Sequence, residues 1–147
     1  GGGDVILIPE LPYDIHNIGN TIIERLKKGK PYSIVVVAEG IQTIDGKKAA
    51  EYIAQEIEYE TGFETRETVL GYIQRGGSPT PYDRNLATRM GGHATELIAS
   101  GQLGRMVSLQ GAKIGSISLD EVAGKLKLVH ENHDLIVQGK RMGICFG

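Results

Sequence analysis

Three arginines surround a glycine-rich turn in the middle of the chain, and their chemistry suits a phosphate group. Arg66, Arg75 and Arg84 lie within the stretch RETVLGYIQRGGSPTPYDR, residues 66–84. A guanidinium group carries a fixed charge and a planar fork of N–H donors, so it can bind two phosphate oxygens at once. Two glycines follow Arg75 directly and let the backbone come close to a ligand. The alternative is an ordinary turn between a strand and a helix, with solvated arginines.

The residues around Arg75 predict a strand before it and a helix after it. The apolar run of residues 68–73 is typical of a buried strand. A long helix is expected at about 82–100, with Ser78 or Thr80 as its cap. Arg75 would then lie at the carboxyl end of a strand, which is where ligands bind in open α/β sheets.

The rest of the chain alternates between short apolar strands and amphipathic helices. We expect strands at 4–9, 32–38, 105–109 and 114–119, the last two as a hairpin, and helices at about 14–28, 45–60, 120–128 and 133–143. This alternation predicts an α/β fold with a mainly parallel sheet flanked by helices, in a Rossmann-like three-layer arrangement. The sequence contains no obvious linker.

Composition narrows the classes of partner. The chain has 147 residues, 40% of them apolar and 23% charged, which suits a globular domain with a sizeable core. Its net charge of −2 gives no reason to expect nucleic acid or an anionic membrane surface as a partner. The single cysteine, Cys145, excludes an internal disulfide and a thiolate metal cage. We expect a cytoplasmic protein without a membrane span, and no metal site in this chain.

Glu39 is a second candidate for ligand chemistry. It directly follows the strand expected at 32–38, so the sheet holds it in place. A carboxylate there can accept hydrogen bonds from sugar hydroxyls, or it can cap the next turn. Its position alone favours neither reading.

The string GYIQRGGSPTPYDR, with ETR shortly before it, closely resembles the sugar-phosphate-binding segment of the 6-phosphofructokinases. The resemblance implies that residues 1–147 are the C-terminal part of such an enzyme and contribute to both of its α/β domains. It also implies that the substrate, fructose 6-phosphate, contacts Glu39, Arg66, Tyr72, Ile73, Gln74 and Arg75. The whole enzyme would transfer a phosphoryl group from ATP or pyrophosphate to the sugar 1-hydroxyl in glycolysis. Its Mg²⁺ would be held by ligands outside this chain.

Tyr72 departs from the pattern of the family. The better-known bacterial members carry a histidine at this place, where it contacts the sugar phosphate. A tyrosine hydroxyl can donate a hydrogen bond, but it does not become cationic near pH 7. Sugar-phosphate binding should therefore depend less on pH through this position.

The resemblance also implies a homo-oligomer, either a dimer or a tetramer. In the family, the arginine at the position of Arg66 reaches into the site of a neighbouring subunit, whereas the one at Arg75 binds within its own subunit. If the chain between them is an extended strand, at ~3.3 Å per residue, they lie roughly 25–30 Å apart. A two-fold axis would then bring Arg66 of one subunit to the pocket of the other. The alternative for Arg66 is a surface ion pair with Glu64 or Glu67.

A second, effector-binding site is suggested by Gly2, Asp4, Lys28 and Lys30. In allosteric bacterial members, an acidic residue after paired glycines and the lysines of a K-G-K run bind a nucleoside diphosphate. Here Asp4 stands where glutamate is more usual, and Pro31-Tyr32 replace a further basic pair. The alternative is a solvated pair of lysines at the end of a helix, favoured by the helix dipole.

The catalytic segments of the family are not found in this sequence. It has no Thr-Ile-Asp-Asn-Asp segment, which carries the catalytic base in the family. Gly2-Gly3-Asp4 superficially resembles the family's Gly-Gly-Asp loop, which holds the phosphoryl donor with magnesium. However, the residues that follow Asp4 match a different, later segment of the family. By itself the chain should therefore bind part of the acceptor and catalyse nothing. A non-catalytic phosphosugar- or nucleotide-binding module on the same scaffold is the alternative. A Rossmann-type oxidoreductase fragment ranks last, because the G-x-G-x-x-G turn is missing.

Overall fold

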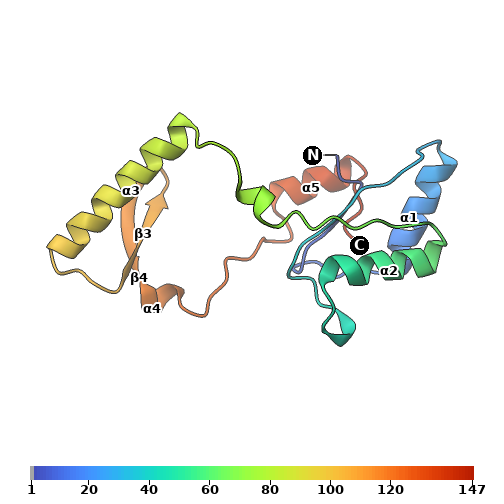
Figure 1. Cartoon of the computed structure of the whole chain (residues 1–147), viewed down its shortest axis with the longest axis horizontal. Helices are drawn as coiled ribbons and strands as arrows, with labels where there is room; N and C mark the ends of the chain where they lie inside the picture. Colours follow the sequence, from blue (N-terminus) through green and yellow to red (C-terminus); the bar gives the residue numbers. More distant parts are fainter. Residues whose placement is uncertain (1) are drawn as a thin grey trace. The chain divides into compact units, whose positions relative to one another are not determined.

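The computed structural model describes residues 2–147 and divides them into two compact units. Unit 1 contains residues 2–70 and 128–147, and unit 2 contains Gly71–Lys127. Figure 1 shows the chain coloured by residue number, with the helices of both units labelled.

Unit 1 is built on two short parallel strands and the helices that cover them. β1 (Val5–Leu7) pairs in parallel with β2 (Val35–Val37), and Cys145 adds a parallel bridge to Val5. The helices are α1 (Ile15–Lys27), α2 (Ala49–Thr61) and α5 (Asp134–Arg141), with a short 3-10 helix η1 (Ile44–Gly46) before α2. The parallel pair and the intervening helix are what an α/β fold requires.

Local signals set the ends of these helices. The Asp14 side chain accepts a hydrogen bond from the His16 backbone N–H at 3.0 Å and so caps the start of α1. Gly62 ends α2 in the left-handed conformation, with φ of 72°, which glycine adopts without strain. The helices predicted at 14–28 and 45–60 are confirmed, although α2 begins later because residues 44–46 form η1.

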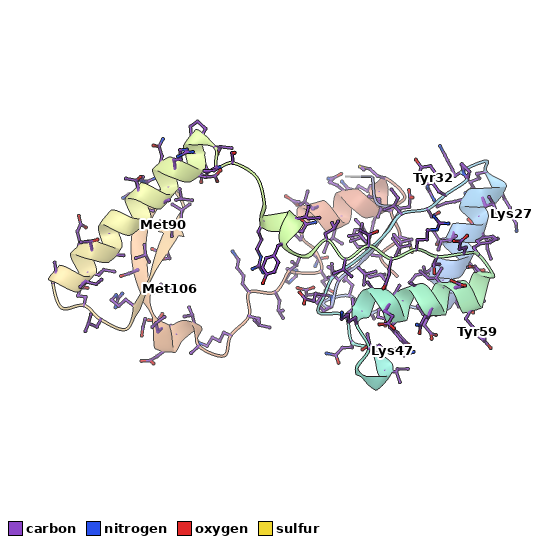
Figure 2. All side chains as sticks on the ribbon, viewed as in Figure 1. Lys27, Tyr32, Lys47, Tyr59, Met90 and Met106 are labelled. Atoms are coloured by element: carbon purple, nitrogen blue, oxygen red, sulfur yellow. The ribbon has the colours of Figure 1, made fainter. Side chains whose placement is uncertain are left out.

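The core of unit 1 is small and lies between the strands and the helices α1 and α2. The side chains of Val5, Leu7, Ile18 and Ile53 are almost completely buried, since none is more than 1% exposed. Several large apolar side chains lie outside this core: Tyr32 is 70% exposed and Tyr59 is 89% exposed (Figure 2).

Unit 2 is built on one long helix and a β-hairpin, and it also contains two short helices, η2 (Gly71–Arg75) and α4 (Leu119–Val122). α3 (Pro81–Ala99) contacts both strands of the hairpin formed by β3 (Arg105–Gln110) and β4 (Lys113–Ser118), which are antiparallel (Figure 1). Gly111, with φ of 62°, lies in the turn between the two strands. Figure 2 places Met90 on α3 and Met106 on β3. The helix predicted at 82–100 and the hairpin are confirmed.

The strand predicted at 68–73 is wrong. Residues 68–70 are not paired with another strand, and η2 (Gly71–Arg75) is a 3-10 helix. Val69 is 67% exposed and Ile73 is 76% exposed, so the apolar run is not buried within the described residues. A strand requires a neighbour for its backbone groups. Without one, the chain leaves the extended conformation at Gly71, whose φ is 51°.

The structure differs from the sequence prediction in two smaller features. The helix expected at 120–128 is only the four residues of α4 (Leu119–Val122), and Gly124 follows it with φ of 70°. The described strands form two separate two-stranded sheets.

No helix within residues 2–147 is both long and apolar enough to cross a membrane.

Candidate functional site

The 3-10 helix η2 determines how Arg75 is presented. A 3-10 helix has three residues per turn, so side chains at positions i and i+3 lie over one another. Tyr72 and Arg75 have this spacing, and the guanidinium carbon of Arg75 lies over the Tyr72 ring, 5.8 Å from its centroid. Both residues are exposed. The Gly76 backbone N–H donates to the carbonyl of Ile73 at 3.1 Å and closes the turn.

The N-cap residue of α3, Thr80, lies five residues beyond Arg75 and makes the hydrogen bonds that cap the helix. The Thr80 hydroxyl accepts from the Asp83 backbone N–H at 3.3 Å, and Asp83 Oδ2 accepts from the Thr80 backbone N–H at 2.7 Å. This reciprocal pair is a capping box, with Pro81 at the first helical position. The hydrogen bonds from the Thr80 side chain and backbone hold the pKa of the Asp83 carboxyl below its ordinary value. Thr80 is therefore confirmed as the cap.

Arg66 lies in the segment between α2 and η2. Its Nε and Nη2 both lie 2.9 Å from Glu64 Oε1, and both side chains are largely exposed. Thr65 ties this segment to α2, because its hydroxyl donates to the Ala54 carbonyl at 3.1 Å. Within unit 1, Arg66 therefore forms the surface ion pair that was the alternative to its role in binding.

Glu39 lies in the turn that follows β2, and its side chain is exposed. The Ala38 backbone N–H donates to the Leu7 carbonyl at 3.0 Å, so the carboxyl ends of β1 and β2 lie together. The same edge carries Glu10, a carboxylate that the sequence did not single out. Glu10 Oε1 accepts from the Val129 backbone N–H at 3.0 Å. Its position after a strand was the signal that could have identified it.

The predicted sugar-phosphate residues are divided between the two units. Glu39 and Arg66 belong to unit 1. Tyr72, Arg75 and the two residues between them, Ile73 and Gln74, belong to unit 2 and are exposed on η2. The 25–30 Å spacing that we expected between Arg66 and Arg75 assumed an extended strand, and this assumption is wrong because η2 is helical.

Unit 1 also contains a hollow of about 390 Å³ that brings basic side chains together. It is lined by Thr21, Glu24, Arg25, Lys28, Lys30, Gly143, Ile144 and Cys145. The hollow therefore includes both lysines of the predicted effector site. The sequence missed Arg25 and residues 143–145, because only the fold brings the C-terminal segment beside α1.

Asp4 does not line this hollow directly but is bonded to it. Asp4 Oδ1 lies 2.7 Å from Arg25 Nη2, and Asp4 Oδ2 accepts from the Ile34 backbone N–H at 2.8 Å. The side chains of Arg25 and Asp4 are 28% and 17% exposed. Gly2 has φ of 88° and is not among the lining residues. Asp4 thus joins α1 to the start of both strands.

The described residues do not fit the Mg²⁺ that the resemblance implies for the whole enzyme. Among residues 2–147, with the Asp45 side chain left aside, no three carboxylate, imidazole or thiol side chains gather into a group that could hold a metal ion. We therefore assign no step to a metal in this chain.

The sequence of the chain is similar to that of several known proteins. Residues 1–98 match the family model described as "Phosphofructokinase". Over its full length the chain is 81% identical to ATP-dependent 6-phosphofructokinase 3 of Bacteroides thetaiotaomicron, and it covers 44% of that protein. It is 46% identical to ATP-dependent 6-phosphofructokinase of Spirochaeta thermophila and covers 45% of that protein. The chain thus spans less than half the length of these curated relatives.

Solved structures share the fold. A pyrophosphate-dependent phosphofructokinase from Nitrosospira multiformis superimposes with a TM-score of 0.69 at 29% identity. That match covers 87% of this chain and 35% of the Nitrosospira chain. A second one, from Marinobacter aquaeolei, has a TM-score of 0.70 at 22% identity, covering all of this chain and 38% of the other, and it supports the fold alone.

Proposed function

Because the chain belongs to the phosphofructokinase family, we propose that it is the part of a longer 6-phosphofructokinase that binds fructose 6-phosphate. The full-length polypeptide would phosphorylate the sugar 1-hydroxyl to give fructose 1,6-bisphosphate. The relatives of known name include ATP-dependent and pyrophosphate-dependent enzymes, so either compound is a candidate donor. The reaction is a step of glycolysis, and we propose that it takes place in the cytoplasm.

One observation carries the proposal: the way in which unit 2 presents Arg75. Its guanidinium is exposed at the end of η2, next to the glycines that precede the capped start of α3. Within residues 2–147, with the Asp45 side chain left aside, Arg75 takes part in no salt bridge. Its N–H donors are therefore free for the two oxygens of a phosphate, and each well-formed bond contributes about 1.5–3 kcal/mol.

The remaining predicted residues have distinct roles in this proposal. Tyr72, Ile73 and Gln74 line the approach to Arg75 on η2, and Glu39 accepts hydrogen bonds from the sugar hydroxyls. Arg66 completes the phosphate site of a neighbouring subunit in a homodimer or homotetramer, and binding there would replace its exposed pair with Glu64. That exchange costs little, because exposed ion pairs are worth about 0–1 kcal/mol.

The hollow beside α1 is proposed as the effector site. Lys28 and Lys30 offer two ammonium groups there, and Asp4 is joined to the hollow through Arg25. An anionic nucleotide would interact favourably with these charges. The catalytic base, the donor site and the Mg²⁺ ligands are proposed to come from outside this chain.

The test is an activity assay of the full-length polypeptide that contains this chain. With fructose 6-phosphate, Mg²⁺ and either ATP or pyrophosphate, it should form fructose 1,6-bisphosphate. Arg75→Ala should lower kcat/KM for the sugar phosphate at least tenfold, or about 1.4 kcal/mol. Arg141→Ala, which removes an exposed arginine of α5, should leave kcat/KM unchanged.

The outcomes separate enzyme from binding module. Product formation that depends on Arg75 supports the kinase. Tight fructose 6-phosphate binding without product from either donor supports the non-catalytic module. If the polypeptide shows no fructose 6-phosphate binding and no turnover, the assignment to fructose 6-phosphate is refuted.

A further inference from the structure

Tyr72 and Arg75 form a pair whose geometry is produced by the backbone of η2. Both residues belong to the same 3-10 helix, Gly71–Arg75, and their i,i+3 spacing stacks one side chain over the other. The guanidinium carbon lies over the ring, 5.8 Å from its centroid, which is within the ~6 Å range of a cation–π interaction. The pair therefore requires no contact from elsewhere in the molecule.

The kind of partner decides what Arg75 can still bind. A carboxylate partner accepts hydrogen bonds from the guanidinium N–H groups, as Glu64 does from Arg66 at 2.9 Å. Those are the same donors that a phosphate needs. An aromatic ring attracts the cation through its face and accepts none of the N–H groups at the guanidinium edge. The ring thus restrains Arg75 and leaves its phosphate-binding donors available.

We propose that Tyr72 is a positioning residue that acts through its ring, holding the Arg75 guanidinium ready for the sugar phosphate. This inference rests on the proposed function, since it assigns Arg75 to the phosphate of fructose 6-phosphate. It adds that the phenol hydroxyl is dispensable. The ring reduces the conformational freedom that an exposed arginine side chain loses when it binds a ligand.

The expected effect follows from the exposure of the pair. Tyr72 is 85% exposed, so the interaction belongs to the weak end of the range for cation–π contacts. Loss of the ring should raise the KM for fructose 6-phosphate about two- to fivefold. The turnover number, kcat, should change little, because the restraint acts equally on bound substrate and transition state.

The experiment uses four variants of the full-length polypeptide: Tyr72→Ala, Tyr72→Phe, Arg75→Ala and the double variant with alanine at both positions. Tyr72→Phe keeps the ring face and should retain the wild-type KM, whereas Tyr72→Ala should raise it. In the double variant, Tyr72→Ala should add nothing to the effect of Arg75→Ala, because the ring acts only through the guanidinium. Tyr59→Ala, which removes an 89% exposed ring of α2, is the matched control and should have the wild-type KM.

The outcomes distinguish this inference from the proposed function. If Tyr72→Phe raises KM as much as Tyr72→Ala, the hydroxyl is the contact and the inference is overturned. It is equally overturned if Tyr72→Ala has no effect, or if its effect persists in the absence of Arg75. If Arg75→Ala itself leaves KM unchanged, the proposed function fails. Circular dichroism and fructose 6-phosphate titration of each variant give the affinity per folded molecule.

Discussion

The ion pair between Asp4 and Arg25 allows a sharp test of how unit 1 is held together. The perturbation is Asp4→Asn, which keeps the shape of the side chain and removes its charge. Asp4 Oδ1 lies 2.7 Å from Arg25 Nη2, and Oδ2 accepts from the Ile34 backbone N–H at 2.8 Å. The two side chains are only 28% and 17% exposed, so solvent screens the pair less than a surface pair.

The magnitude follows from these contacts. A hydrogen bond to a charged group contributes about 1.5–3 kcal/mol, and a neutral one about 0.5–1.5 kcal/mol. Asparagine can still accept from Ile34 but loses the attraction to Arg25. We therefore expect the free energy of opening of the β1–β2 pair to fall by about 1–2 kcal/mol.

Native-state hydrogen exchange of the full-length polypeptide measures this opening locally. The protection of the amides in β1 and β2 should fall by a factor of about 5–30. Glu24→Gln is the matched control, because Glu24 lines the same hollow and the variant removes the same charge. Its contact with Lys28 is 3.7 Å long and both side chains are more than two thirds exposed, so its loss should cost at most ~0.5 kcal/mol. Equal protection changes in the two variants would show that the Asp4–Arg25 ion pair does not stabilise the β1–β2 pair.

Four further predictions concern the binding residues and the start of α3. Glu39→Gln should weaken fructose 6-phosphate binding, measured as KM, with an unchanged circular dichroism spectrum; loss of the fold with intact affinity per folded molecule would make Glu39 structural. Thr80→Ala should lower the opening free energy of the first turn of α3 by about 1 kcal/mol in hydrogen exchange. Because the pKa of Asp83 is lowered, its stabilisation is present above the ordinary carboxyl pKa and is lost as the pH falls through the lowered value. Protection of this turn should thus decline below about pH 4 in the wild type but not in Asp83→Asn, and identical pH profiles would contradict the capping box. Mixed Arg66→Ala and Arg75→Ala subunits, confirmed as hybrids by native mass spectrometry, should recover some activity, and no recovery would refute a shared site.

Elements with a signal in their own sequence could be predicted. Thr80 caps α3 through Asp83, three residues away, and Gly62 ends α2 by its own backbone conformation. The hairpin of β3 and β4 turns at Gly111. In each case the deciding interaction lies within a few residues, so the local pattern contains the information.

The failures depend on partners far away in the chain. The run at 68–73 has the composition of a strand, but a strand forms only beside another one, and none lies there in the described residues. Arg25 was missed because its place in the hollow depends on residues 143–145, which are more than a hundred positions away. The stacking of Tyr72 on Arg75 was missed as a consequence of the wrong strand prediction. A 3-10 helix brings the side chains at positions i and i+3 together, whereas a strand does not.

The most direct test of phosphate binding by Arg75 is a calorimetric titration that isolates the contribution of the phosphate group. The full-length polypeptide and its Arg75→Ala variant are each titrated with fructose 6-phosphate and with fructose. We expect the wild type to bind the phosphorylated sugar much more tightly than fructose. We also expect Arg75→Ala to weaken fructose 6-phosphate binding at least tenfold, or about 1.4 kcal/mol, without changing the affinity for fructose. If the variant binds fructose 6-phosphate as tightly as the wild type does, Arg75 does not contact the phosphate and the central claim is contradicted.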